Sequence, residues 1–455
     1  MSRSALSEPT VVGETTGSPV SILINRDFAL LWSGQAISIL GDLIFTTTIT
    51  IWVGLVLARG QSWGALAVSG ILAAGALPPL LLAPLAGVLV DRSNKRQLMI
   101  AMDAVRAVVI LGLLALPLVG SRHWSPFSQW LVVGGGVLLV SCCEQFFRPS
   151  MTALVNDLVP QPLQPRAIGL GQVSLSLAAI AGPPLATLVL FSTGLQWALL
   201  FNAFSFLISC LSILAIQPVP NIEQMRDHTP QHRFIREFGT GVRFFFGNRK
   251  LRTLTVALVI ALFGAGAFQA LDLFFITRNL HAPPTDYGLL EAAQGLGMLL
   301  GAVLASIFTA RAGLTRVVWS SLVVTGLLAL VYARLTSFLP AAMLLFVIGI
   351  PLASISVACE PLILSLTPRE LIGRVLAIFA PIITLAGMLG VALAGYLDSV
   401  VLRSFHFEVL GQYFGPIDSI FSGAGLLAVL GGFFALAGLR GRTSPPAETT
   451  PSHDK

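Results

Sequence analysis

Charged residues are what this sequence has least of. Asp, Glu, Lys and Arg together make up 11% of its 455 residues, whereas about 25% is usual for a soluble globular protein. Cysteine and histidine are also scarce, at four and six residues, and none stand at the spacing of a metal site. The phosphate-binding pattern Gly-x-x-x-x-Gly-Lys does not occur. We therefore expect no bound metal, no cofactor and no direct use of ATP.

Long apolar runs take the place of charge. Hydrophobic residues make up 55% of the chain, and we count about twelve apolar runs, each close to the ~20 residues with which a helix spans a bilayer. The strands of a membrane barrel would instead be alternating segments of ~10 residues. The sequence therefore predicts an all-α membrane protein with twelve transmembrane helices, whose main partner is the lipid bilayer.

The basic residues indicate how these helices are oriented. Short loops rich in Lys and Arg stay on the cytoplasmic side of a membrane, and most of the 27 Lys and Arg fall on the side shared by the two ends of the chain. Residues 87–96 (GVLVDRSNKR), between the second and third runs, form one such loop. We expect both termini to be cytoplasmic. The net charge of +6 then reflects membrane topology, not binding of nucleic acid.

An internal repeat predicts two related halves. Leu154-Val155, Leu158, Pro160 and Arg166 recur with identical spacing as Leu362-Ile363, Leu366, Pro368 and Arg374, just before the fifth and eleventh runs. Parallel repeats of six helices are typical of secondary transporters, with a substrate site between the halves. The predicted organisation is a disordered cytoplasmic tail (1–26), a six-helix bundle (27–217), a cytoplasmic amphipathic linker (218–253), a second six-helix bundle (254–439) and a cytoplasmic tail (440–455).

Helix boundaries are expected at two further features. The fourth helix is predicted to end at Arg148, because Pro149 removes a backbone hydrogen bond. In the loop of residues 87–96, Asn94 stands before the last basic pair, and an asparagine tolerates the left-handed backbone of a tight turn.

Two motifs carry a resemblance to a known superfamily. Residues 87–96, with Gly87, Asp91, Arg92 and Arg96, resemble the signature loop of the major facilitator superfamily. Residues 182–186 (GPPLA) in the fifth run resemble that superfamily's antiporter motif, in which Gly182-Pro183 would kink a helix that faces the other half; the usual Gly-Gly ending is replaced by Ala186-Thr187. The resemblance spans residues 25–442 and implies the major facilitator fold.

Shorter features resemble one branch of that superfamily, the macrolide-efflux and enterobactin-exporter group. They are Asn25-Arg26-Asp27-Phe28, Gly41-Asp42, Arg148-Pro149, Pro368-Arg369-Glu370 and Gly373-Arg374-Val375. Members of this group are exporters of the bacterial inner membrane, driven by the proton gradient. The resemblance therefore implies a proton-coupled efflux antiporter in the cell membrane, active as a monomer, with multidrug or siderophore export as the expected role.

Asp42 is the leading candidate for proton coupling. An ionisable side chain at membrane depth costs about 2.5–3.5 kcal/mol on insertion scales, so its presence suggests a function. Gln35, Ser38, Asp42 and Thr46 share one face of the first helix through steps of three or four residues. This polar stripe is expected to line a cavity in which Asp42 exchanges a proton. The alternative is a carboxylate that only bonds a neighbouring helix.

Other ionisable or polar residues in apolar runs are further candidates for the coupling site or the substrate cavity. Glu360 could bind a proton or a substrate cation, or only pair with a basic loop residue. The pairs Gln269 with Asp272, and Glu291 with Gln294, each share a helix face and could form an outer vestibule, or be solvated at its rim.

A second set of charges is predicted to form a cytoplasmic gate. Asp103 and Arg106 are one helical turn apart, as are Glu144 and Arg148, so each pair can form an ion pair. Together with Asp91, Arg92 and Arg96 they could close the cavity when the halves meet, because breaking such pairs biases a conformational equilibrium.

The sequence therefore predicts a secondary transporter that exports an amphipathic small molecule in exchange for protons. An uptake permease or a lipid flippase of the same fold is the alternative within transport. A polytopic membrane protein without transport activity is the alternative of another class. An enzyme is not expected, because His123, His281 and His406 are scattered, away from carboxylates at useful spacing.

Overall fold

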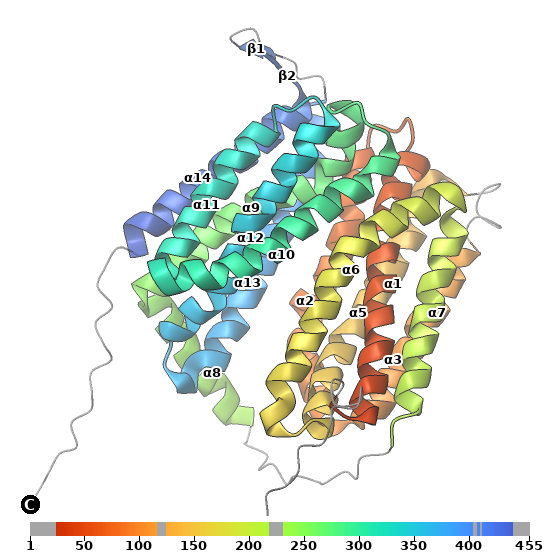
Figure 1. The fold of residues 1–455 in the computed structure, drawn as a ribbon, viewed down its shortest axis with the longest axis vertical. Coiled ribbons are helices and arrows are strands. Elements are labelled where there is room, and N and C mark those ends of the chain that lie inside the picture. The colour runs from red at the N-terminus through yellow and green to blue at the C-terminus, as the bar shows by residue number, and fades with distance from the viewer. Residues whose placement is uncertain (1–23, 116–123, 218–230, 404–406, 410–411, 440–455) are drawn as a thin grey trace, which may run out of the picture.

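Twelve helices long and apolar enough to cross a membrane build the described part of the chain, which confirms the predicted all-α membrane fold. The computed structural model describes residues 24–115, 124–217, 231–403, 407–409 and 412–439. The helices form two side-by-side bundles (Figure 1). A small hairpin, β1 (Phe407–Val409) paired with β2 (Gln412–Phe414), is the one element of sheet in these ranges.

Six of the twelve spans form the N-terminal half. They are α1 (Arg26–Trp52) with its π-helical extension η2 (Val53–Leu57), α2 (Gly64–Arg92), α3 (Lys95–Leu114), α5 (Pro126–Leu158), α6 (Gln164–Ser192) after the short turn η4 (Gln161–Leu163), and α7 (Leu195–Leu214).

The other six spans form the C-terminal half. They are α9 (Arg249–Arg278), α10 (Tyr287–Ala312) after the turn η5 (Pro284–Asp286), α11 (Leu314–Tyr332), α12 (Phe338–Ser365), α13 (Ile372–Tyr396) between the turns η6 (Arg369–Leu371) and η7 (Leu397–Val401), and α14 (Pro416–Leu439). A shorter helix, α8 (Gln231–Gly247), precedes them within the predicted linker.

The repeated sequence gives the same local structure in both halves. Pro160 and Pro368 each cap a 3₁₀ turn with nearly identical backbone angles, φ −55° and ψ 142° for Pro160 and φ −56° and ψ 144° for Pro368. Proline fixes φ near this value and has no N–H to satisfy, which suits the first position of a helix entry. Each turn leads directly into a long helix, α6 or α13.

In each half, an asparagine at the start of the first helix forms an equivalent long-range hydrogen bond. Asn25 caps α1, and its amide donates to the carbonyl of Leu158 at 2.8 Å. Asn248 caps α9, and its amide donates to the carbonyl of Leu366 at 3.2 Å. Leu158 and Leu366 occupy equivalent places in the repeat, so one asparagine in each half joins the first helix to the turn before the fifth.

Among the described residues, the two halves share an apolar core at one end of the molecule only. We call this the hairpin end, because β1 and β2 lie there, and the opposite end, where α8 lies, the linker end (Figure 1). One cluster of buried residues contains members of both halves, and a Cβ atom on Gly54 would stand 2.9 Å from Leu273 Cδ2 of the other half, near the hairpin end. At the linker end the described clusters are separate, one around Leu31 and Met99 and the other around Phe245 and Leu254. The two halves are therefore closed against each other at the hairpin end.

Small residues allow this close approach. A Cβ atom added to Gly395 of α13 would overlap Ser69 Oγ and stand 2.8 Å from the carbonyl oxygen of Ala65, both in α2. The first turn of α2 also uses the other half as its cap, because the N–H of Leu66 donates to Ser399 Oγ at 3.1 Å. Such helix-end N–H groups need a partner when water is excluded. The inter-half contact therefore stabilises α2 itself.

Two of the boundary predictions are wrong. The fourth span does not end at Arg148, since α5 continues through Pro149 to Leu158. The packing of α5 against α2 and α3 outweighs the roughly 3 kcal/mol that an interior proline costs. Asn94 does not take a left-handed backbone; its φ is −69°, and its side chain caps α3 by accepting from the N–H of Gln97 at 3.2 Å. Capping is the common role of asparagine at such a position.

Candidate functional site

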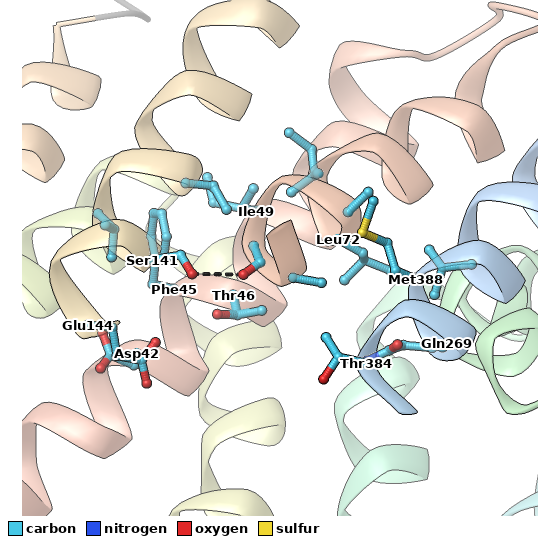
Figure 2. Close-up of a pocket in the computed structure, with 18 of the residues that line it drawn as sticks. Asp42, Phe45, Thr46, Ile49, Leu72, Ser141, Glu144, Gln269, Thr384 and Met388 are labelled. Carbon is cyan, nitrogen blue, oxygen red and sulfur yellow. Dashed lines mark hydrogen bonds between the residues drawn. The ribbon is translucent and has the colours of Figure 1, made fainter. Parts of the chain in front are cut away.

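A cavity of about 470 Å³ lies between the two halves (Figure 2). Residues of α1, α2, α3 and α5 line one side, and residues of α9 and α13 line the other. Ile49, Ile71 and Val391 belong both to the lining and to the shared core of the hairpin end. That core therefore forms one wall of the cavity, at its hairpin side.

The lining is mostly apolar, and its charge comes from one half only. Asp42, Arg106 and Glu144 are its charged residues, all from the N-terminal half, whereas the C-terminal half contributes the uncharged polar residues Gln269 and Thr384. Figure 2 shows the Asp42 and Glu144 side chains on the side opposite Gln269 and Thr384. The apolar lining residues include Phe45, Leu72, Leu262, Ile383 and Met388. A cavity with an apolar wall and a few convergent polar groups is typical of a small-molecule site.

Asp42 reaches the cavity because α1 packs closely on α7 at the preceding residue. A Cβ atom on Gly41 would overlap Ser205 and lie 2.8 Å from the side-chain oxygen of Asn202, so only glycine permits this approach. Asp42 lies on a different face of α1, where its side chain is 36% exposed. Its carboxylate stands 3.8 Å from the Arg106 guanidinium. Asp42 is therefore both accessible from the cavity and next to a buried cation.

Arg106 connects this carboxylate to the interior of the N-terminal half. Its guanidinium also pairs with Asp103, and both side chains are almost wholly buried. The Phe147 and Phe206 rings hold the guanidinium at 4.5 and 4.3 Å from their centroids, which is the geometry of cation–π contacts. One buried arginine therefore serves two carboxylates, of which only Asp42 faces the cavity.

Two polar side chains extend the network beyond Asp103. Ser209 Oγ donates to Asp103 at 2.6 Å, and Gln35 Nε2 donates to Ser209 Oγ at 2.8 Å. Charge-assisted hydrogen bonds of this kind satisfy a buried carboxylate. Ser209 was absent from the candidates because a lone serine in an apolar helix has no distinctive sequence signal.

The polar stripe of the first helix therefore does not line the cavity along its whole length. Asp42 and Thr46 belong to the lining, but Gln35 and Ser38 do not; they are buried at 5% and 2% exposure. The stripe follows one helix face, but α7 covers its first part through Ser209. Gln35 acts as a hydrogen-bond donor to the buried network.

Glu144 and Arg148 form an ion pair at 2.9 Å, with side chains 38% and 72% exposed. Glu144 also belongs to the cavity lining. A pair this exposed contributes little stability, about 0–1 kcal/mol. Glu144 is therefore placed where a ligand in the cavity could contact it as well.

The candidates of the C-terminal half are divided between two places. Gln269 lines the cavity. Asp272 is buried and accepts a hydrogen bond of 2.7 Å from the Tyr332 hydroxyl, and Glu291 lies one helical turn after the buried Tyr287 on α10, outside the cavity lining. Asp272 is thus buried inside the C-terminal half and not solvated at a rim. The outer vestibule that the spacing of these residues suggested does not form part of the described cavity.

Glu360 is exposed on α12 and does not belong to the cavity lining. Within the described ranges no basic residue forms an ion pair with it. The pairing with a loop residue that the sequence suggested is therefore not seen in these ranges.

The gate candidates whose side chains are described are not brought together as one network. Arg96 donates to the carbonyls of Ile213 and Leu214 at the end of α7. Asp103 and Arg106 lie deeper along α3, in the network described above. Gly87, in α2, has open space where a side chain would stand. Asp91 and Arg92 end α2, but their side chains lie outside the described part of the structure.

The Gly182-Pro183 motif lies where α6 contacts both α1 of its own half and α10 of the other half. A Cβ atom on Gly182 would stand 2.9 Å from Leu43 Cβ of α1, and one on Gly288 of α10 would overlap the carbonyl of Pro183. The motif thus allows one helix to pack closely on its own half and on the other half. In the described ranges no group of three or more His, Cys, Asp or Glu is arranged to hold a metal ion.

Two six-helix halves around a central cavity define a membrane transporter of the major facilitator superfamily. Residues 17–402 match the family described as "Transmembrane secretion effector", so the chain belongs to that family. Solved structures agree on the fold: the chain superimposes with a TM-score of 0.69 on a bacterial homologue of the iron transporter ferroportin in an inward-facing state, at 14% identity, covering 92% of this chain and 99% of that one.

Named relatives are transporters of the same type. The chain is 26% identical to the uncharacterized MFS-type transporter YfiS of Bacillus subtilis over 84% of this chain and 89% of that protein. It is 28% identical to the multidrug efflux pump Tap of Mycobacterium tuberculosis over 75% of this chain and 80% of that protein. It is 24% identical to macrolide efflux protein A of Streptococcus pyogenes over 62% of this chain and 66% of that protein. The resemblance stated from the sequence motifs is thereby confirmed.

Proposed function

We propose that this protein exports an amphipathic small molecule across a bacterial inner membrane in exchange for protons, and that it is a transporter without enzyme activity. The observation that carries the proposal is the position of Asp42, a carboxylate accessible from the central cavity and 3.8 Å from the buried Arg106. The named efflux relatives, at 24–28% identity, support export as the direction.

The cavity favours an apolar molecule with a cationic group. Its wall offers aliphatic and aromatic carbon, and its ionisable groups include two carboxyl groups, Asp42 and Glu144. Arg106 is only 3% exposed and also pairs with Asp103, so the carboxyl groups are the titratable groups of the lining that a ligand can reach most easily. A cation bound at Asp42 would compete with a proton for the same carboxylate, which is the simplest way to couple two opposite fluxes.

Transport would proceed by alternating closure of the two ends. The closed hairpin end and the separate cores at the linker end correspond to one of the two conformations. With the linker end on the cytoplasmic side, as the distribution of Lys and Arg favours, this is the conformation that takes substrate from the cytoplasm. Rocking of one half against the other around a fixed site would give the second conformation.

The direct test is transport by the purified protein in liposomes loaded with a fluorescent lipophilic cation. An imposed proton gradient should drive the cation against its own concentration difference, with protons moving the opposite way. Movement of both in the same direction would indicate uptake, and movement insensitive to the pH gradient would exclude proton coupling.

Gly395→Val is expected to shift the protein away from the conformation closed at the hairpin end. The added side chain would meet Ser69 and Ala65 where α2 and α13 touch, so the closed contact loses stability relative to the other conformation. The measurement is labelling of Thr46→Cys, a cavity residue, by an impermeant maleimide from the linker side in a variant without the four native cysteines. Labelling should become severalfold slower.

Gly423→Val is the matched control for this change, because a Cβ atom at Gly423 of α14 would meet nothing within 4 Å. It should leave the labelling rate unchanged. Equal labelling of the Gly395 variant and the control would contradict the role of this contact.

The loop of residues 87–96 is proposed to act as the cytoplasmic gate. Asp91→Asn should then slow the transport cycle and leave substrate affinity unchanged, because the residue would stabilise one conformation without touching substrate. The measurement is turnover in liposomes beside equilibrium binding of the same cation. A variant with weaker binding and normal turnover would place Asp91 in the substrate site instead.

A further inference from the structure

A second cavity, of about 400 Å³, lies on the outer surface of the C-terminal half at the linker end. Its residues come from two helix faces. On α9 they are Arg249 and the residues three, four and seven positions after it, Arg252, Thr253 and Val256; on α14 they are Phe434 and the residues three and four positions after it, Ala437 and Gly438. Residues at such steps share one helix face. The cavity is therefore a groove that runs along the seam between the first span of this half and the last.

The floor of the groove is formed by a close helix contact. A Cβ atom on Gly438 would overlap the side chain of Thr253, and one on Gly431 would stand 2.8 Å from the carbonyl oxygen of Ala257. Because the helices touch here, the groove is shallow and opens outward, away from the central cavity. The residues that line it are not shared with the transport site.

The groove changes character along its length. Arg249 and Arg252 stand at its linker end, in the first turn of α9, and both are exposed. Val256 and Phe434 follow at 42% and 45% exposure. Seven residues of helix separate Arg249 from Val256, which is about 10 Å along the axis. Two cations at the membrane boundary are thus followed directly by apolar wall at the depth of lipid chains.

The two arginines have no acidic partner within the described ranges. The N–H groups of Lys250 and Leu251 at the start of α9 are already bonded to the Asn248 side chain. Any attraction for an anion therefore comes from the guanidinium groups, which bind phosphate through paired N–H donors.

We propose that this groove binds an anionic phospholipid of the leaflet at the linker end, with its phosphate between Arg249 and Arg252 and an acyl chain along Val256 and Phe434. The order of charge and apolar surface matches that of a phospholipid, and basic pockets between membrane helices bind such headgroups. A free phosphate would use the arginines but leave the apolar wall without a partner.

Native mass spectrometry of the purified full-length protein tests this proposal. The protein should retain phosphatidylglycerol in preference to phosphatidylcholine with the same acyl chains. Arg249→Gln with Arg252→Gln should lower the retained fraction roughly tenfold or more, since each basic residue near an anionic lipid surface contributes measurably. Phe434→Ala should lower it as well.

The control variant is Arg311→Gln with Arg316→Gln, which removes the same charge from two exposed arginines of the same half and the same end that do not line the groove. It should retain the lipid as the unchanged protein does. Equal loss in both double variants would mean a diffuse attraction to the basic surface, and would overturn the site.

Two measurements on the unchanged protein keep the proposal testable if a variant does not fold. An excess of glycerol 3-phosphate, which carries the phosphate without acyl chains, should not displace phosphatidylglycerol. Displacement would identify a site for soluble phosphate instead of lipid. Equal retention of phosphatidylglycerol and phosphatidylcholine would also overturn the proposal.

Discussion

Asp42→Asn is expected to reduce proton-driven transport to background while leaving the protein folded. Asparagine keeps the size and the hydrogen-bonding capacity of the side chain but cannot release a proton. Asp42 is partly exposed to the cavity, so its replacement leaves no buried cation without a partner, because Arg106 keeps its pair with Asp103. The measurement is substrate flux in liposomes under an imposed pH gradient.

The control for this variant is Asp157→Asn. Asp157 also pairs with a basic residue, Lys95, at 2.6 Å, but both side chains are about one third exposed, at 37% and 34%, and neither lines the cavity. An exposed pair contributes about 0–1 kcal/mol, so transport should stay close to normal. Full gradient-driven transport by Asp42→Asn would remove Asp42 from the coupling mechanism.

Substrate binding gives a second test of the same residue. If a cationic substrate and a proton compete for Asp42, substrate affinity of the unchanged protein should fall as the pH is lowered, because protonation removes the negative charge that attracts the cation. In Asp42→Asn this pH dependence should disappear or become much smaller. A pH dependence unchanged by the substitution would point to Glu144, the other carboxylate of the lining.

The fold was predictable because its strongest signals are long and local. Each spanning helix needs its own run of about 20 apolar residues, so helix number can be read without knowing any contact. The repeat around Pro160 and Pro368 was equally visible, because a proline-capped turn is specified by a few neighbouring residues. The exception was Pro149, where packing by other helices decided that α5 continues.

The site was predictable only in part, because it depends on which helix covers which face. Asp42 and Thr46 follow Gln35 and Ser38 on one stripe, yet α7 covers the first part of it. Periodicity shows which residues share a face and not what lies opposite. Two aromatic rings, Phe147 and Phe206, stack on the Arg106 guanidinium and come from two other helices. In the sequence, a phenylalanine in an apolar run looks the same whether it faces lipid or a guanidinium.

The same limit explains why the sequence alone predicts Arg106 to be part of the gate. Its spacing from Asp103 predicts an ion pair, and the loop before α3 is rich in charge, so a single network was the natural inference. The structure instead turns Arg96 toward the end of α7 and Arg106 toward Asp42. Ten residues of helix, about 15 Å, separate these two arginines.

Arg106→Gln is expected to destabilise the N-terminal half strongly, as well as to abolish transport. Asp103 is fully buried, and without the guanidinium it would keep only the hydrogen bond from Ser209. Removal of one partner from a buried ion pair typically costs about 3–5 kcal/mol, because the remaining charge stays uncompensated. Thermal unfolding of the detergent-solubilised protein, followed by size-exclusion chromatography, measures the effect.

Arg148→Gln is the matched control, since Arg148 also pairs with a carboxylate one turn away but is 72% exposed. The thermal stability of this variant should differ little from that of the unchanged protein. A loss in Arg106→Gln no larger than in this control would show that the buried pair contributes nothing to the fold.

A double variant separates the structural role of Arg106 from its functional one. In Asp103→Asn with Arg106→Gln both charges are gone, so no unpaired buried carboxylate remains, and stability should largely return. Transport should not return, because Asp42 would still lack the cation 3.8 Å from its carboxylate. Recovery of transport together with stability would mean that Arg106 serves only to neutralise Asp103, and Asp42 would then exchange its proton without help from the buried network.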